Sequence, residues 1–110
     1  MCRLDIASYL VSLVHIKSIN MRIEKPVKII NKLGLHARAA TQLVQLANTF
    51  QASITVFKED KSADANSVLG LMMLESHQGE TVTIVSEGVD AEQAFDAIRA
   101  LIAGRFNEEE

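Results

Sequence analysis

The sequence NKLGLHARAA, residues 31–40, joins a segment typical of a strand to a segment typical of a helix. Before it, apolar residues alternate with polar ones, and after it they recur at helical spacing. A helix that begins here leaves the backbone N–H groups of its first turn without intrahelical partners, at the positive end of the helix dipole. The stretch therefore predicts a site that stabilises an anion such as a phosphate.

The side chains of this stretch suit phosphoryl chemistry. His36 falls at the expected N-cap, beside the anion site, and a neutral imidazole is a competent nucleophile. Arg38 adds a fixed charge with forked donors to the first turn, where a cation otherwise opposes the dipole. Taken alone, such a histidine is more often a cap or a surface residue, and such an arginine a solvated one. The pair suggests phosphorylation of His36, with Arg38 stabilising the phosphate.

Composition limits the class of protein. The chain has 110 residues and a formal net charge of −3, which fits one globular domain and argues against nucleic-acid binding. Its single cysteine, Cys2, excludes an internal disulfide and favours a reducing compartment such as the cytoplasm. The three histidines, His15, His36 and His77, lack the spacing of metal ligands. We expect no metal and no cofactor.

Residues 1–20 form an expected N-terminal extension, and residues 21–110 the functional domain. The apolar stretch at residues 6–16 is interrupted by polar residues and is shorter than the ~20 residues of a spanning helix, so we expect no membrane segment. A signal peptide is an alternative, but Asp5 follows Arg3 and no cleavage pattern precedes Met21. The simpler interpretation is that the domain starts at Met21.

Hydrophobic periodicity predicts seven elements within residues 21–110. Residues 22–29 alternate as a half-buried strand, which Pro26 confines to a sheet edge because proline lacks a ladder donor. The others are a helix at 37–48, a hairpin of strands at 52–57 and 61–65, a short helix capped by Asn66 or Ser67 and ending near Leu74, a strand at 81–85, and a helix that starts at Asp90, has Gln93 in a capping box and stops near Gly104. The order βαββαβα predicts an α+β fold, with three helices on one face of a four-stranded antiparallel sheet.

Two helix faces are expected to meet a partner. The short helix cannot bury all its apolar residues, so part of it should form an exposed patch, although its methionines could equally fill the core. The first helix offers a neutral polar face. The predicted partner-binding residues are Ala37, Thr41, Gln42, Gln45, Val68, Leu69 and Met72.

Several ordered motifs resemble the HPr family of histidine phosphocarriers of the bacterial phosphoenolpyruvate-dependent phosphotransferase system. They are Gly34-Leu35-His36-Ala37-Arg38, Ala65-Asn66-Ser67-Val68 and the closing amphipathic helix. The resemblance covers Met21 to the C-terminus, and its ordered motifs favour His36 as a nucleophile over a simple cap. Residues 31–34, 64–68 and 71–74, with the acidic tail 106–110, resemble the nitrogen-branch group of the family, the NPr proteins.

This resemblance implies an open-faced β-sandwich and a carrier rather than a stand-alone enzyme. We expect the protein to be a monomer. His36 would take a phosphoryl group on a ring nitrogen from an enzyme I type donor and pass it to an EIIA type acceptor, with Arg38 neutralising the phosphate. Ser67 matches a serine that a dedicated kinase phosphorylates in some relatives, although capping is the ordinary use of serine there. Ala39 replaces the usual proline, which leaves one more free N–H and a looser turn.

Other interpretations stay open at this point. Sugar-branch HPr proteins tend to carry lysines on the exposed face of the first helix, where this chain has Gln42, Gln45 and Asn48. That difference favours the nitrogen branch over a sugar-branch HPr. A metabolite-sensing module, or a protein-binding regulator without phosphoryl chemistry, is the alternative from a different class.

Overall fold

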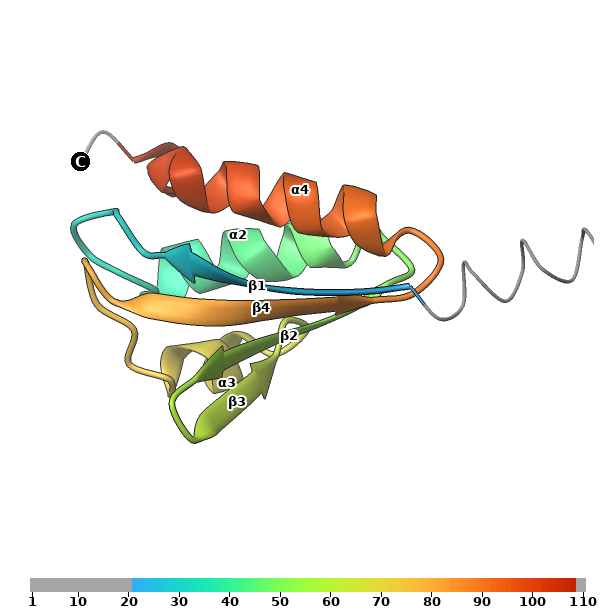
Figure 1. Ribbon diagram of the computed structural model, residues 1–110. Coiled ribbons are helices and arrows are strands. Elements are labelled where there is room, and N and C mark those ends of the chain that lie inside the picture. Colours follow the sequence, from blue (N-terminus) through green and yellow to red (C-terminus); the bar gives the residue numbers. More distant parts are fainter. Residues whose placement is uncertain (1–20, 109–110) are drawn as a thin grey trace, which may run out of the picture.

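The computed structural model describes residues 21–108, so the predicted extension at residues 1–20 lies outside the described residues. One antiparallel sheet has the strand order β1-β4-β2-β3, and three helices cover one of its faces (Figure 1). The elements are β1 (Arg22–Lys28), α2 (Ala37–Ala47), β2 (Ser53–Lys58), β3 (Lys61–Asp64), α3 (Val68–Met72), β4 (Thr81–Glu87), α4 (Ala91–Ala103) and the 3-10 turn η1 (Arg105–Asn107). The predicted α+β architecture is confirmed. Within residues 21–108, no helix is long and apolar enough to cross a membrane.

Strand β1 is an edge strand, as Pro26 predicts. Its inward positions Ile23 and Val27 pack against the core. Lys25, which shares their alternation, is exposed, with its ammonium 5.8 Å from the centroid of the Phe95 ring. A lysine can keep this position because its apolar stem lies along the core while its charge stays in water.

The hairpin is tighter and α3 shorter than predicted. Pairing of Lys58 with Lys61 leaves a two-residue turn at residues 59–60. Ser67 is the N-cap of α3, and its hydroxyl accepts a hydrogen bond from the Gly70 N–H at 3.0 Å. The helix ends at Met72 rather than near Leu74.

Two predictions near β4 are corrected by long-range pairing. The strand runs to Glu87 instead of residue 85, because residues 86 and 87 pair with both neighbouring strands. The capping box at Asp90 is wrong: Asp90 is the N-cap of α4 but makes no side-chain cap. Its carboxylate instead accepts hydrogen bonds from the backbone N–H groups of Gln51 and Ala52, at 3.0 and 2.8 Å. Asp90 therefore ties the start of α4 to the start of β2.

The chain turns sharply after α4, which ends at Ala103 with Gly104 as its C-cap, close to the predicted end. Arg105, Phe106 and Asn107 all adopt left-handed backbone conformations, with φ of 58°, 53° and 66°. Each such residue costs about 1 kcal/mol or more. Phe106 is 0% exposed, and burying a phenylalanine contributes about 1.5–3 kcal/mol toward that cost. The turn leaves the described C-terminal end beside the loop that precedes α2 (Figure 1).

Candidate functional site

His36 is the N-cap of α2, with an extended backbone (φ −84°, ψ −177°) and no side-chain cap. The first helical hydrogen bond joins the Ala40 N–H to the His36 carbonyl at 2.8 Å. The N–H groups of residues 37–39 make no hydrogen bond within the described part of the chain. Because residue 39 is alanine, three donors stand free at the positive end of the helix.

The imidazole of His36 lies between two oxygen acceptors. Its Nδ1 is 3.1 Å from the Gly34 carbonyl oxygen, and its Nε2 is 3.1 Å from Oε2 of Glu108. The histidine side chain is 28% exposed and the glutamate side chain 12%. The ring is therefore accessible to a partner while its outer nitrogen faces a largely covered carboxylate.

Asn31 connects the two residues that supply these acceptors. Its side chain is fully buried, and its Nδ2 donates both to the Gly34 carbonyl at 2.8 Å and to Oε1 of Glu108 at 3.2 Å. Neither Asn31 nor Glu108 was among the residues predicted for the site. Their only signals in the sequence are an asparagine three residues before Gly34 and an acidic tail, which point to the family but not to a place in the site.

Gly34 shapes the loop that presents the histidine. It has φ of +69°, and a Cβ at this position would overlap the carbonyl oxygen of Ser76. That oxygen accepts a hydrogen bond from the Leu35 N–H at 2.9 Å. The segment between α3 and β4, which contains Ser76, therefore supports the histidine loop directly. Nearby, the His77 N–H and then the Lys58 ammonium hold the pKa of the Glu80 carboxyl below its ordinary value. His77 itself is exposed, as predicted.

Arg38 lies two residues beyond His36 and is exposed. Among residues 21–108, no carboxylate forms an ion pair with it. Its guanidinium is therefore not committed to a structural contact in this region, as a group reserved for an incoming anion would be.

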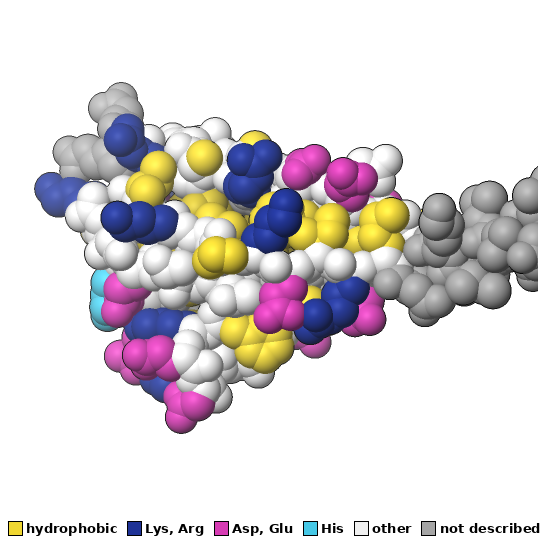
Figure 2. All heavy atoms as spheres, in the orientation of Figure 1, with side chains coloured by type: hydrophobic (Ala, Val, Ile, Leu, Met, Phe, Trp, Pro, Cys, Tyr) yellow, Lys and Arg dark blue, Asp and Glu magenta, His cyan; other side chains and the backbone are white. Residues whose placement is uncertain are grey.

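The predicted partner face is only partly continuous. Ala37, Thr41 and Gln45 are exposed along α2, whereas Gln42 is half-buried and accepts a hydrogen bond from Asn107 at 3.1 Å. Val68 is half-buried and packs against the core. The exposed large apolar side chains on and near α3 are Leu69 (69%), Met72 (38%) and Met73 (65%). On the face in Figure 2, by contrast, charged side chains of both signs are interspersed with apolar ones.

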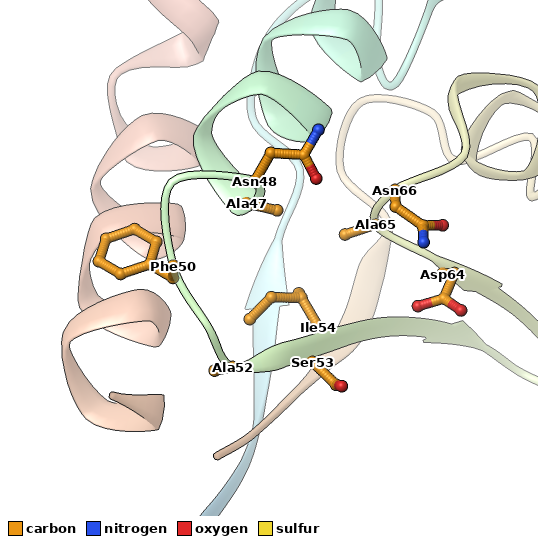
Figure 3. Close-up of a pocket in the computed structure, with 9 residues that line it drawn as sticks. All are labelled: Ala47, Asn48, Phe50, Ala52, Ser53, Ile54, Asp64, Ala65 and Asn66. Carbon is orange, nitrogen blue, oxygen red and sulfur yellow. The ribbon is translucent and has the colours of Figure 1, made fainter. Parts of the chain in front are cut away.

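A small hollow of about 180 Å³ lies at the other end of α2 (Figure 3). It is lined by Ala47, Asn48, Phe50, Ala52, Ser53, Ile54, Asp64, Ala65 and Asn66. Since Asn66 lies beside the end of α2, its neighbour Ser67 is placed away from the helix start that carries His36. The structure therefore does not bring Ser67 and His36 into one site.

Comparison with known proteins decides the family. The family model described as "PTS HPr component phosphorylation site" matches residues 23–104, which include the histidine loop, the three helices and the four strands except for Arg22, the first residue of β1. This chain belongs to the HPr family. It is 53% identical over 87 residues to phosphocarrier protein NPr of Shewanella violacea, covering 79% of this chain and 96% of that one.

Other members of the HPr family give the same picture. Phosphocarrier protein HPr of Cupriavidus necator is 46% identical over 88 residues, covering 80% of this chain and 99% of that protein. The crystal structure of HPr from Thermoanaerobacter tengcongensis superposes with a TM-score of 0.76 at 42% identity, covering 80% of this chain and 99% of that one. The family model stops before η1 and Glu108, so the match leaves out the turn that reaches His36.

Proposed function

We propose that this protein is a phosphoryl carrier of the phosphotransferase system and that His36 accepts the phosphoryl group on Nδ1. The observation that carries the proposal is the position of His36 at a helix start with three free N–H donors. Nδ1 is the ring nitrogen nearer the backbone, whereas Nε2 is turned to Glu108. Membership of the HPr family supports the same role.

Phosphoryl transfer needs only a few groups from this protein. The Nδ1 lone pair forms the N–P bond while the bond from phosphorus to the donor breaks, and the donor keeps that electron pair. The phosphoryl oxygens are then met by the free N–H groups and by Arg38. Passing the group onward reverses these steps. Since one chain supplies the nucleophile, the arginine and the helix start, we infer that a single copy suffices and that docking supplies the positioning.

The partners we propose are an enzyme I type donor and an EIIA type acceptor in the cytoplasm. Leu69 and Met72 offer an exposed apolar surface for docking near the histidine helix. The neutral Gln45 and Asn48 favour the nitrogen branch, because rim charges govern encounter rate and partner choice. The 53% sequence identity to an NPr supports this branch. Competing rate measurements with nitrogen-branch and sugar-branch donors test it, and faster transfer from the sugar-branch enzyme would exclude it.

Mass measurement after incubation with phosphoenolpyruvate and a cognate enzyme I tests the carrier role. The wild type should gain one acid-labile phosphoryl group. The variant His36→Ala should gain none, while His77→Ala, which removes an exposed histidine outside the site, should behave as the wild type. Phosphorylation of the His36→Ala variant would show that the acceptor is another residue.

A further inference from the structure

Glu108 has a buried oxygen that lacks a donor. Its Oε2 lies 3.1 Å from His36 Nε2, the distance of an ion pair, but without the alignment of a hydrogen bond. No other hydrogen-bond donor reaches this oxygen within the described residues. A buried acceptor without a donor is costly, and Nε2 is the group placed to supply one. A small rotation of the imidazole would align an Nε2–H with the carboxylate.

The two acceptors around the ring compete for its proton. A neutral imidazole carries one N–H, which can point either to the Gly34 carbonyl or to the Glu108 carboxylate. The carbonyl has hydrogen-bond geometry toward Nδ1 but already accepts a hydrogen bond from Asn31 at 2.8 Å, whereas the carboxylate oxygen accepts none. Hydrogen bonds to ionised acceptors are also the stronger ones. The unsatisfied carboxylate therefore favours the proton on Nε2, which would leave the lone pair on Nδ1.

The carboxylate is held in this position by the turn after α4. Phe106 is anchored in the core, Asn107 donates to Gln42 at 3.1 Å, and Asn31 donates to the second oxygen of Glu108 at 3.2 Å. Three successive left-handed residues, none of them glycine, are needed to make that path. The contact between Glu108 and His36 is thus supported on both sides rather than left to a free tail.

We propose that Glu108 is a positioning residue that acts through His36 and shifts the equilibrium between the unphosphorylated and the phosphorylated carrier. The proposal rests on the function proposed above. When the Nδ1 lone pair forms the N–P bond and the donor keeps the electrons of its broken bond, the ring still holds its Nε2 proton and becomes positively charged. The adjacent carboxylate stabilises that cation, as acidic partners of imidazoles do in other sites. Glu108 therefore favours the phosphorylated carrier.

The variant Glu108→Gln tests the charge while keeping the shape, because the amide oxygen can still accept from Asn31. Glu92→Gln is the matched control, since Glu92 is exposed in the first turn of α4 and makes the same change in net charge. Nitrogen NMR of the unphosphorylated protein at pH ~8.5, above the ordinary range of histidine, should show Nε2–H in the wild type and less of it in Glu108→Gln. The equilibrium constant for phosphorylation by enzyme I should fall about tenfold in Glu108→Gln and stay unchanged in Glu92→Gln.

The measurements distinguish a failure of this inference from a failure of the proposed function. A wild-type ring protonated on Nδ1 overturns this inference even if phosphoryl transfer is normal. So does an equilibrium constant that is equal in the wild type and in Glu108→Gln, or that falls equally in Glu92→Gln. A wild type that takes up no phosphoryl group overturns the proposed function instead, and the NMR measurement still decides the position of the proton.

Discussion

The two ends of α2 are both lined with polar groups, yet only one suits a phosphoryl group. At the start of the helix, free N–H donors and Arg38 accompany His36, the proposed nucleophile. At its end, the hollow has Asn48 and the carboxylate of Asp64 on its wall (Figure 3). That end carries the negative pole of the helix dipole, to which Asp64 adds. The sign of the helix end, more than the presence of a cavity, therefore distinguishes the proposed phosphoryl site from the hollow.

Arg38→Ala should give the largest effect of the substitutions that leave the histidine in place. Losing one charged group that stabilises the transferring phosphoryl should slow transfer roughly tenfold to a thousandfold. Asn48→Ala, at the other end of α2, should leave the rate unchanged. Rapid-quench measurement with a phosphorylated donor compares the two. Equal rates in the wild type and Arg38→Ala would remove the arginine from the site and weaken the contrast between the helix ends.

Gly34→Ala should destabilise the loop at the active end of α2. A Cβ with this positive φ is strained, and it also overlaps the Ser76 carbonyl, so we expect a loss of about 2 kcal/mol or more in the free energy of unfolding. Gly79→Ala is the control, because Gly79 has φ of +89° but open space around it. Urea unfolding of both variants separates the overlap from the strain. Equal losses would show that the contact with Ser76 contributes nothing.

Ser67 tests the region near the other end of α2. Ser67→Ala removes the cap on Gly70 and should cost about 1 kcal/mol of stability without changing chemistry at His36. Ser67→Asp keeps a capping group but puts a negative charge beside the apolar docking residues, so it should weaken partner binding. Titration calorimetry with enzyme I measures the affinity. If Ser67→Asp binds as tightly as the wild type, the serine is only a cap.

The smallest effect is expected from a chain that starts at Met21. It keeps every strand, helix and site residue described here, so it should match the full chain in melting temperature and in transfer rate. Thermal unfolding followed by circular dichroism makes the comparison. A clearly lower melting temperature would show that residues 1–20 contribute to the domain.

Local sequence patterns predicted most of the fold and about half of the residues of the candidate site. Alternation and helical spacing located the strands and helices, and Pro26 placed β1 at an edge. The errors came from partners distant in sequence. The backbone N–H groups that donate hydrogen bonds to the Asp90 carboxylate lie 38 and 39 residues upstream, and Asn31 and Glu108 are 77 residues apart. The left-handed turn that brings Glu108 to Asn31 contains no glycine, so the sequence gives no sign of it. His36 and Arg38 could be predicted as candidates because the histidine, the arginine and the helix start are neighbours in the chain.

The anchoring of Phe106 has a practical consequence for labelling. Since Glu108 follows the buried ring by only two residues, anything fused after Glu110 is tethered within a few residues of His36. At about 3.5 Å per extended residue, an affinity tag there would start close to the surface that a donor must approach. Purification tags therefore belong at the opposite terminus. A small environment-sensitive dye at the C-terminus, by contrast, would report phosphorylation optically, because the added charge would develop within its reach.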